Sequence, residues 1–382
     1  ILDNCLHTCS KPLESSITKA TFMIEFYSWK NLLLKCRFER ESLMMFAKVE
    51  SQSNGIDLIK IDNEETKIVF TNYGARIVSW KYDDNNIVLG NVVEADEFYE
   101  SNPYNFGATV GRYGGRIANA TFELDSKKYE LDANNGVHNI HGGPNGIDKR
   151  FFDYKIEEQV GQVKVIFTTT IQSADDHFPG DIDLEVIHTY NVDHKWTIEY
   201  KAKSTEKTLF NPMNHVYFNL NRDNNVIDNH SISSSKLDMY LLGEDNIVKS
   251  MEPLSLVNTF QEQNIQFKDI FDSEDAIVKE QMQRFGGIDH PFDIGGNEMT
   301  VENKHFILKV NTDMPNIVIY TFNDTTGWNS DFNIYKAHSG FTLETQCIPN
   351  DINLLGDQAP SILEANEPFY SKTSYKISEK QL

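Results

Sequence analysis

Four segments of the chain combine histidine, arginine, asparagine and acidic residues with glycine and aromatic neighbours. A β-sheet core has no structural need for polar side chains at such density. Imidazole and carboxylate groups are the usual carriers of acid–base catalysis, so these segments are the first candidates for chemistry. They are residues 111–119 together with 137–143, residues 211–220, residues 287–293 and residues 341–346.

Two of these residues stand out, although each has an ordinary structural explanation when it is taken alone. His215 lies in Asn-His-Val-Tyr-Phe-Asn-Leu, a predicted strand in which a single histidine is more often a hydrogen-bonded core residue. Glu344 lies in the β-prone run Thr-Leu-Glu-Thr-Gln, where Leu343 and Thr345 must face the side opposite to it. An inward Glu344 needs a partner or a raised pKa, because burying a carboxylate is costly.

The elements that must position these groups are predicted to be strands. Polar and apolar residues alternate with a period of two along residues 163–171, 184–190 and 196–202. A helical pattern is found only around residues 275–284. The sequence therefore predicts an all-β fold of large antiparallel sheets, a sandwich or a barrel, with few short helices.

Turn sequences separate the predicted strands, for example at residues 83–86, 134–136 and 295–297. The segment Asp175–Gly180 is also predicted to form a turn, ahead of the strand that begins near Leu184, rather than a metal site. The glycines of residues 111–115 do not open a helix after a strand, so a nucleotide-binding fold has little support.

Composition narrows the class of partner. The 382 residues carry a formal net charge of −22, which disfavours nucleic acid, anionic membranes and densely phosphorylated substrates. The sequence contains no apolar stretch of the ~20 residues that a membrane-spanning helix needs. After residue 36 it has a single cysteine, Cys347, which indicates a reducing compartment, and we expect a cytoplasmic protein.

The first 45 residues differ from the rest. They hold three of the four cysteines and carry nearly balanced charge. We predict an N-terminal extension over residues 1–45 that adds nothing to catalysis and need not be part of the native protein, followed by one domain over residues 46–382. The alternative is a short amphipathic helix that packs on the domain. Cys5 and Cys9 lack a matching downstream pair at zinc spacing, so we expect no metal there.

Five motifs in a fixed order resemble the signature motifs of the aldose 1-epimerase family, which includes the galactose mutarotases. The resemblance runs from about residue 50 to the C-terminus. It implies a β-supersandwich of large antiparallel sheets with a sugar in an open cleft, and no cofactor or metal. The motifs are Gly-Arg-Tyr-Gly-Gly-Arg-Ile-Ala, Ile-His-Gly-Gly, Asn-His-Val-Tyr-Phe-Asn-Leu, Asp-His-Pro-Phe and Leu-Glu-Thr-Gln.

The resemblance also implies roles for individual residues. His215 matches the general acid of the family and Glu344 its general base. His141 matches a histidine that contacts the sugar and supports the acid step, while Arg116 and Asp289 match residues that hold the sugar. Exchange of anomers needs a base at the C1 hydroxyl and an acid at the ring oxygen at the same time, which a carboxylate and an imidazolium supply. Carboxylates near His215 would help to keep it protonated.

Several neighbouring residues have less certain assignments. Gly115 stands where many relatives carry asparagine, so a hydrogen bond to a sugar hydroxyl is missing and the preferred hexose cannot be carried over. Three aromatic residues are candidates for stacking against the sugar, although most such residues are core: Tyr217, Phe292 and Trp328. Three charged or polar residues beside the matched positions are either structural or support the site: Arg112, His138 and His290.

The expected function is therefore exchange of the α and β anomers of free hexoses such as galactose or glucose, which would supply a sugar kinase with the correct anomer. A hexose 6-phosphate epimerase is the first alternative, but it needs more lysine or arginine beside the cleft than Arg112 and Arg116. A non-catalytic sugar-binding protein is the second, against which the presence of both His215 and Glu344 argues. The expected partner is a small neutral sugar, and the chain is a monomer or a homodimer.

Overall fold

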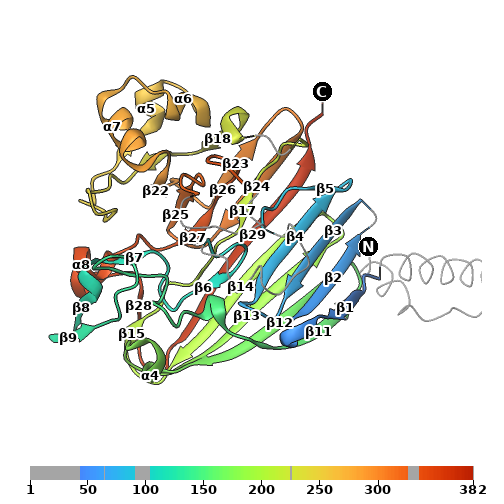
Figure 1. Cartoon of the computed structure of the whole chain (residues 1–382), viewed down its shortest axis with the longest axis horizontal. Helices are drawn as coiled ribbons and strands as arrows, with labels where there is room; N and C mark the ends of the chain where they lie inside the picture. The colour runs from blue at the N-terminus through green and yellow to red at the C-terminus, as the bar shows by residue number, and fades with distance from the viewer. Residues whose placement is uncertain (1–43, 64, 91–103, 224–225, 326–334, 382) are drawn as a thin grey trace, which may run out of the picture. The chain divides into compact units, whose positions relative to one another are not determined.

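The computed structural model describes residues 44–63, 65–90, 104–223, 226–325 and 335–381 (Figure 1). The predicted N-terminal extension lies outside these residues except for its last two, and it stays a prediction. Met45 is buried and packs in the core of the β domain. Trp328 also lies outside the described residues. No described helix is long and apolar enough to cross a membrane.

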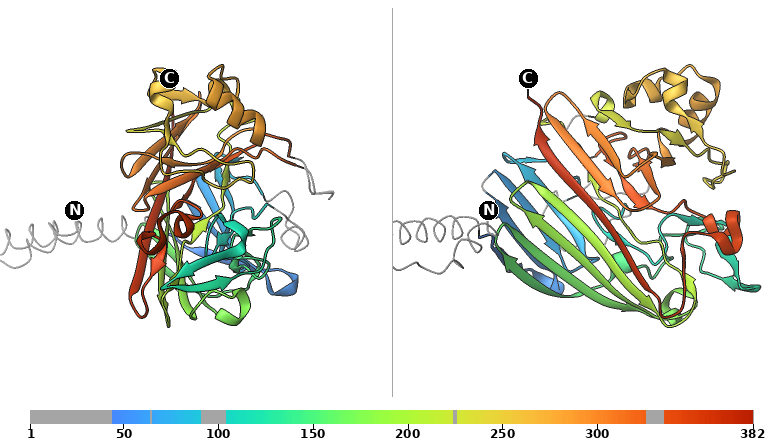
Figure 2. Two further views of the ribbon diagram at one scale, coloured as in Figure 1. Left: turned by 90° about the vertical axis from the view of Figure 1, so that its left-hand side faces the viewer. Right: turned by 180° about the vertical axis from the view of Figure 1, so that it is seen from behind.

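The largest element is an antiparallel sheet of nine strands, whose long members lie side by side in Figure 2. The three runs predicted from alternation are its strands β12, β13 and β14, so this part of the prediction is confirmed. In spatial order the sheet consists of β11 (Asp153–Gln159), β12 (Gln162–Ile171), β13 (Ile182–Asn191), β14 (Lys195–Ser204), β29 (Pro368–Glu379), β24 (Phe306–Thr312), β23 (Glu298–Glu302), β18 (Ser231–Ser234) and β21 (Asn264–Gln266).

A second antiparallel sheet packs against the first part of the nine-stranded sheet. Trp80 of this sheet donates its indole N–H to the Tyr190 hydroxyl of β13 over 3.2 Å, and its ring meets Trp196 of β14 edge to face. All three side chains are fully buried, and burial of each large apolar side chain stabilises the fold by roughly 1.5–3 kcal/mol. The five strands are β1 (Ala47–Ser51), β2 (Asp57–Asn63), β3 (Thr66–Thr71), β4 (Arg76–Tyr82) and β5 (Asn85–Asn86).

A third sheet, also of five strands, carries two of the candidate site segments. Its strands are β20 (Leu254–Ser255), β19 (Asp238–Met239), β22 (Asp289–Asp293), β25 (Asn316–Tyr320) and β27 (Glu344–Gln346). Three short helices lie near it: α5 (Leu256–Phe260), α6 (Phe267–Phe271) and α7 (Ala276–Phe285). The helix α7 fits the predicted helical segment, and the Asp275 side chain caps it by accepting hydrogen bonds from the amides of Ile277 and Val278.

Short two-stranded pairs connect the large sheets. They are β6 (Thr109–Val110) with β16 (Met213–Asn214), β7 (Arg116–Ile117) with β10 (Asn139–Ile140), β8 (Thr121–Leu124) with β9 (Lys127–Glu130), β15 (Thr208–Leu209) with β28 (Ile362–Leu363), and β17 (Tyr217–Phe218) with β26 (Phe341–Thr342). The remaining helices are α4 (Ser173–Asp176), α8 (Asp351–Leu355) and 3-10 turns at Ser53–Gly55, Ala118–Ala120, Ile147–Lys149, Ile227–Asn229 and Gly356–Gln358. The predicted all-β fold with large antiparallel sheets and few short helices is confirmed.

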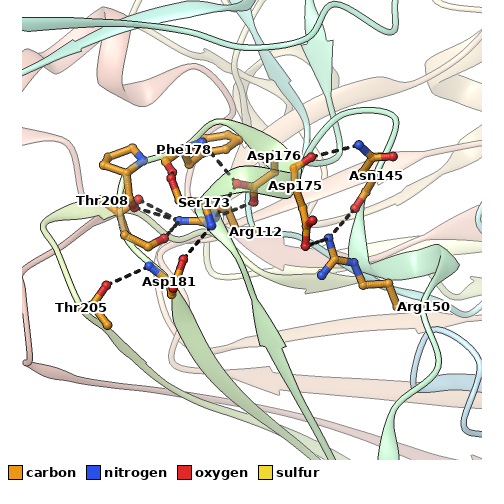
Figure 3. Close-up of polar contacts among 12 residues, drawn as sticks. Arg112, Asn145, Arg150, Ser173, Asp175, Asp176, Phe178, Asp181, Thr205 and Thr208 are labelled. Atoms are coloured by element: carbon orange, nitrogen blue, oxygen red, sulfur yellow. Dashed lines mark hydrogen bonds and ion pairs between the residues drawn. The ribbon is translucent and has the colours of Figure 1, made fainter.

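Arg112 is a structural anchor and not a cleft residue (Figure 3). Its guanidinium is fully buried and makes a two-pronged ion pair with Asp176, with N–O distances of 2.7 and 2.9 Å. It also donates to the carbonyl oxygens of Pro179 and Gly180 and to the hydroxyl of Thr208. The acidic turn before β13 is thus tied to the loop after β6, which is the loop that leads to Arg116.

We expect Arg112→Met to lower the free energy of unfolding by about 3–5 kcal/mol, because it leaves the Asp176 carboxylate buried without its partner. Urea denaturation of both proteins measures the difference. The matched control is Arg222→Met, which breaks the exposed Arg222–Glu379 pair, worth about 0–1 kcal/mol. Equal losses in the two variants would contradict the anchoring role of Arg112.

Candidate active site

All five residues predicted to form the site line one cavity of about 600 Å³. Its walls come from the β7–β10 pair, the β16–β17 segment and the ends of β22, β25 and β27. A larger groove of about 1020 Å³ crosses strands β12, β13, β14 and β29, and it contains none of the five. The structure thus brings the five residues together, while their chemical roles stay predictions. They are Arg116, His141, His215, Asp289 and Glu344.

His215 and Glu344 lie together at the buried base of the cavity. The Nε2 atom of His215 is 3.3 Å from Oε1 of Glu344, and their side chains are 7% and 4% exposed. The His215 backbone is held on both sides, since its amide donates to Ala108 and its carbonyl accepts from Gly107. Leu343 is buried in the main hydrophobic core, so the alternation expected around Glu344 is present.

Burial shifts the pKa values of Glu344 and His215 in the directions that favour their neutral forms. Desolvation raises the pKa of Glu344 to about 8, against opposing hydrogen bonds from Thr342 and Gln346. Desolvation lowers the pKa of His215 to about 4. The opposing cause is a hydrogen bond of the backbone and not a carboxylate, so the expectation that nearby carboxylates keep His215 charged is not met. Between these values the pair holds one proton, which the two groups can exchange over 3.3 Å.

His141 is fixed as a neutral hydrogen-bond donor. Burial, together with the charges of His215 and Arg116, lowers its pKa well below the usual value. The amide of Gly115 donates to Nδ1 of His141 over 3.1 Å, so the ring proton is assigned to Nε2. The His141 ring stands edge-on to His215 with a centroid distance of 5.3 Å. His141 can thus donate a hydrogen bond beside the pair but cannot act as a base in this form.

Arg116 and Asp289 form a half-open polar clamp on the cavity wall. Nη1 of Arg116 is 3.8 Å from Oδ2 of Asp289, and both side chains are 19% exposed. The Nε of Arg116 also donates to the side chain of Asn135 over 3.0 Å. Burial raises the pKa of Asp289 to about 6, although the charge of Arg116 opposes the shift. A guanidinium and a carboxyl group side by side can bind adjacent hydroxyl groups.

The structure shows which of the other candidate residues line the cavity and which have structural contacts instead. Tyr217 lines the cavity with its ring 5.0 Å from that of His215, whereas Phe292 is fully buried in the main hydrophobic core and does not line the cavity. His138 accepts a hydrogen bond from the amide of Asn119, and His290 bonds Gln281 of α7 through Nε2. Both histidines therefore have structural partners.

Sequence reasoning missed several polar residues of the cavity. Some come from turns whose composition indicates only a turn, such as the Asn134-Asn135-Gly136 sequence, whereas Arg284 lies in α7 and Tyr320 ends β25. Asn246, in another loop, donates a hydrogen bond of 3.4 Å to Asp289. No short motif marks them in the sequence. Among them are Tyr104, Asn135, Lys149, Asn246, Arg284, Tyr320 and Asn323.

The packing around Gly115 explains why it is not asparagine. Its φ is +73°, and a Cβ atom at this position would lie 2.4 Å from Cγ and 2.6 Å from Cβ of Pro349. Pro349 thus occupies the space into which a side chain at position 115 would project.

We expect Gly115→Ala to lower the free energy of unfolding by about 1–3 kcal/mol more than Gly136→Ala. Both glycines have positive φ, so both variants incur the backbone strain of about 1–2 kcal/mol, but Gly136 has open space at the Cβ position. Urea denaturation of the two variants isolates the contact with Pro349. Equal stability of the two variants would mean that Pro349 yields without cost.

Comparisons with known proteins point to one enzyme family. A family model described as aldose 1-epimerase matches residues 57–376. The chain is 30% identical over 335 residues to an aldose 1-epimerase of Haemophilus influenzae, covering 84% of this chain and 95% of that protein. It is 28% identical over 358 residues to a galactose mutarotase of Sus scrofa, covering 87% and 97%. A maltose epimerase of Levilactobacillus brevis is 29% identical over 292 residues, covering 74% and 82%.

Solved structures share the fold at lower sequence identity. The crystal structure of a galactose 1-epimerase from Lactobacillus acidophilus has a TM-score of 0.77 at 23% identity and covers 89% of this chain and 100% of its own. An aldose epimerase homologue from C. elegans has a TM-score of 0.72 at 22% identity, with coverage of 85% and 100%. With a family match over most of its length and a relative at 30% identity, the chain belongs to the aldose 1-epimerase family.

Proposed function

We propose that the protein interconverts the α and β anomers of free hexoses by acid–base opening and reclosure of the sugar ring. The observation that carries this proposal is the buried pair of His215 and Glu344, 3.3 Å apart at the base of a cavity lined by hydroxyl-binding groups. The chemistry requires an acid and a base within reach of two oxygen atoms bonded to the same carbon. The pair supplies both.

The reaction proceeds in two halves. Glu344, as carboxylate, accepts the proton of the C1 hydroxyl while the imidazolium of His215 donates a proton to the ring oxygen. The bond between C1 and the ring oxygen breaks, and C1 becomes an aldehyde. After rotation about the C1–C2 bond, the C5 hydroxyl attacks the other face of the carbonyl. His215 takes back the hydroxyl proton and Glu344 returns its proton to the carbonyl oxygen, so the enzyme regains its starting state.

The expected protonation state of the His215–Glu344 pair fits this mechanism. Between pH of about 4 and about 8 the pair holds one proton, either as two neutral groups or as carboxylate and imidazolium. The charged arrangement is the reactive one. Because the two arrangements differ only by the transfer of a proton from Glu344 to His215, no exchange with solvent is needed before the first step.

The remaining cavity residues are proposed to bind the sugar. His141 donates through Nε2 to an oxygen beside the reacting atoms, while Arg116 and Asp289 hold ring hydroxyl groups. Tyr217 offers an aromatic face to the C–H groups of the sugar. Two relatives are a galactose mutarotase and a maltose epimerase, and this supports a neutral sugar substrate. We expect the enzyme to work in the cytoplasm, because residues 46–382 contain one cysteine.

One observation favours a second candidate, a hexose 6-phosphate. Lys149 and Arg284 also line the cavity, so the cations that this alternative requires exist beside the motifs. Arg284 is paired with Glu280, which leaves less of its charge for a phosphate. The neutral hexose is therefore the substrate we propose, and comparison of glucose with glucose 6-phosphate separates the two.

We expect the purified protein to accelerate the change in optical rotation of freshly dissolved α-D-galactose or α-D-glucose. Glu344→Gln should lower kcat by about 10²–10⁴-fold, the usual contribution of a general base, while sugar binding is retained. Polarimetry and calorimetric titration measure the two quantities. Glu364→Gln, at a carboxylate paired with Lys207, is the matched control and should keep full activity. Near-normal turnover by Glu344→Gln would remove Glu344 from the base role.

We also expect a bell-shaped pH profile of kcat/KM after subtraction of spontaneous mutarotation. Activity falls above pH of about 8, where Glu344 loses the shared proton, and below pH of about 4, where His215 takes up a second one. In His215→Ala the residual activity should instead rise through the pKa of Glu344, because only the base is left. A wild-type profile that rises near pH 6.5 and stays level would contradict the shared proton.

A further inference from the structure

Gln346 is the neighbour of Glu344 on the same face of strand β27, and its side chain is fully buried. Its Nε2 donates to Oε2 of Glu344 over 3.0 Å. Its Oε1 accepts from Nδ2 of Asn211 over 3.3 Å. The side-chain amide of Gln346 therefore connects the Glu344 carboxylate to Asn211, which lies outside the third sheet.

The orientation of the Gln346 amide follows from how Asn211 is held. Oδ1 of Asn211 accepts from the amide of Cys347 over 2.8 Å, so its Nδ2 must face Gln346 and the carbonyl of Cys347. The backbone of Asn211 bonds Arg112 and Gly114. Since Asn211 presents a donor, Gln346 must turn its oxygen toward Asn211 and its N–H groups toward Glu344.

Gly114 leaves the space that this arrangement needs. A Cβ atom at position 114 would lie 2.6 Å from Oε1 of Gln346 and 2.8 Å from Cγ of Met213. Any other residue at this position would displace the Gln346 amide. One glycine of the Gly-Arg-Tyr-Gly-Gly-Arg motif is thus explained by packing against the last residue of Leu-Glu-Thr-Gln.

The charges that surround Glu344 come from several elements. Asp289 of β22 raises the pKa of Glu344, Arg116 of β7 lowers it, and His215 lies at 3.3 Å. Tyr217 of β17 and Tyr375 of β29 also face it, and burial keeps both phenols neutral. Besides His215, the recorded hydrogen-bond donors to Glu344 among the described residues are Thr342 and Gln346. Gln346 is the only one of the two that bonds Oε2.

We propose that Gln346 is a positioning residue for Glu344, whose amide, locked by Asn211, stabilises the charged carboxylate and keeps Oε1 turned toward His215. This inference rests on the proposed mechanism, in which the reactive form is carboxylate beside imidazolium. A donor on Oε2 favours that form over the neutral pair. Without it, the shared proton stays on Glu344 for a larger fraction of the time, and less of the enzyme is ready to react.

The first test is Gln346→Met, which keeps the length of the side chain and removes the donor. Loss of one hydrogen bond to a charged group should move the alkaline limb of the kcat/KM profile up by about 1 pH unit. The maximum of kcat/KM should fall about 10-fold through kcat, with KM little changed. Asn211→Asp should move the limb in the same direction, because an acceptor facing Gln346 turns its amide around.

The matched control is Thr345→Val. Thr345 is equally buried on the same strand, but its hydroxyl bonds Thr373 of β29 on the opposite face. This variant loses a buried hydrogen bond and some stability without touching Glu344, so its alkaline limb should stay in place. If Gln346→Met and Thr345→Val have the same pH profile, Gln346 is merely structural and the proposal is wrong.

A second measurement does not depend on turnover. Infrared titration of the protonated carboxyl band, taken as the difference between a protein and its Glu344→Gln counterpart, gives the ionisation midpoint of Glu344 directly. The midpoint should lie about 1 unit higher in Gln346→Met than in an otherwise unchanged chain. An unchanged midpoint overturns the proposal. If the protein has no mutarotase activity but the midpoint shifts, the proposed function fails and the role of Gln346 stands.

Discussion

The structure depends on placing a carboxylate and an imidazole next to each other where each side chain is almost completely buried. Burial of either group in its charged form is unfavourable, and only a partner or a set of hydrogen bonds makes it tolerable. Glu344 has Thr342 and Gln346 on its two oxygens and His215 at 3.3 Å. We therefore expect the two groups to titrate as one unit, with a single shared proton and no net charge on the pair.

Two short strand pairs and the third sheet hold this pair in place. His215 lies in the segment between two short strands that pair with different neighbours, β16 with β6 and β17 with β26. Glu344 opens β27, which pairs with β25 of the third sheet. Arg112 and Asn211 are both buried. The Arg112 side chain ties the loop after β6 to the turn before β13, and the Asn211 side chain bonds Gln346 and Cys347. Strands thus position His215 and Glu344, while the proposed sugar-binding groups Arg116 and His141 come from the β7–β10 pair and the residue after it.

Much of the scaffold could be predicted from the sequence, because period-two alternation is a direct consequence of strand geometry. The strands β12, β13 and β14 follow from this alternation, and the helix α7 follows from a helical pattern. The five convergent site residues followed from ordered motifs and not from spacing, since they lie between 25 and 228 positions apart along the chain. Asn135 and Asn246 could not be found in this way, because turn sequences do not reveal what a side chain contacts. The contact of Gly115 with Pro349 and the dominance of burial over charge at His215 also required three-dimensional packing.

The central claim is that His215 and Glu344 share one proton across the neutral pH range. The most direct test is nitrogen-15 NMR of histidine-labelled protein, with the His215 signals assigned by comparison with His215→Gln. The account predicts that the His215 ring passes from fully charged to largely neutral near pH 4. The nitrogen chemical shifts should change again near pH 8, when Glu344 loses its proton. A single transition near pH 6.5, with no second response, would show that the two groups titrate independently and would contradict the account.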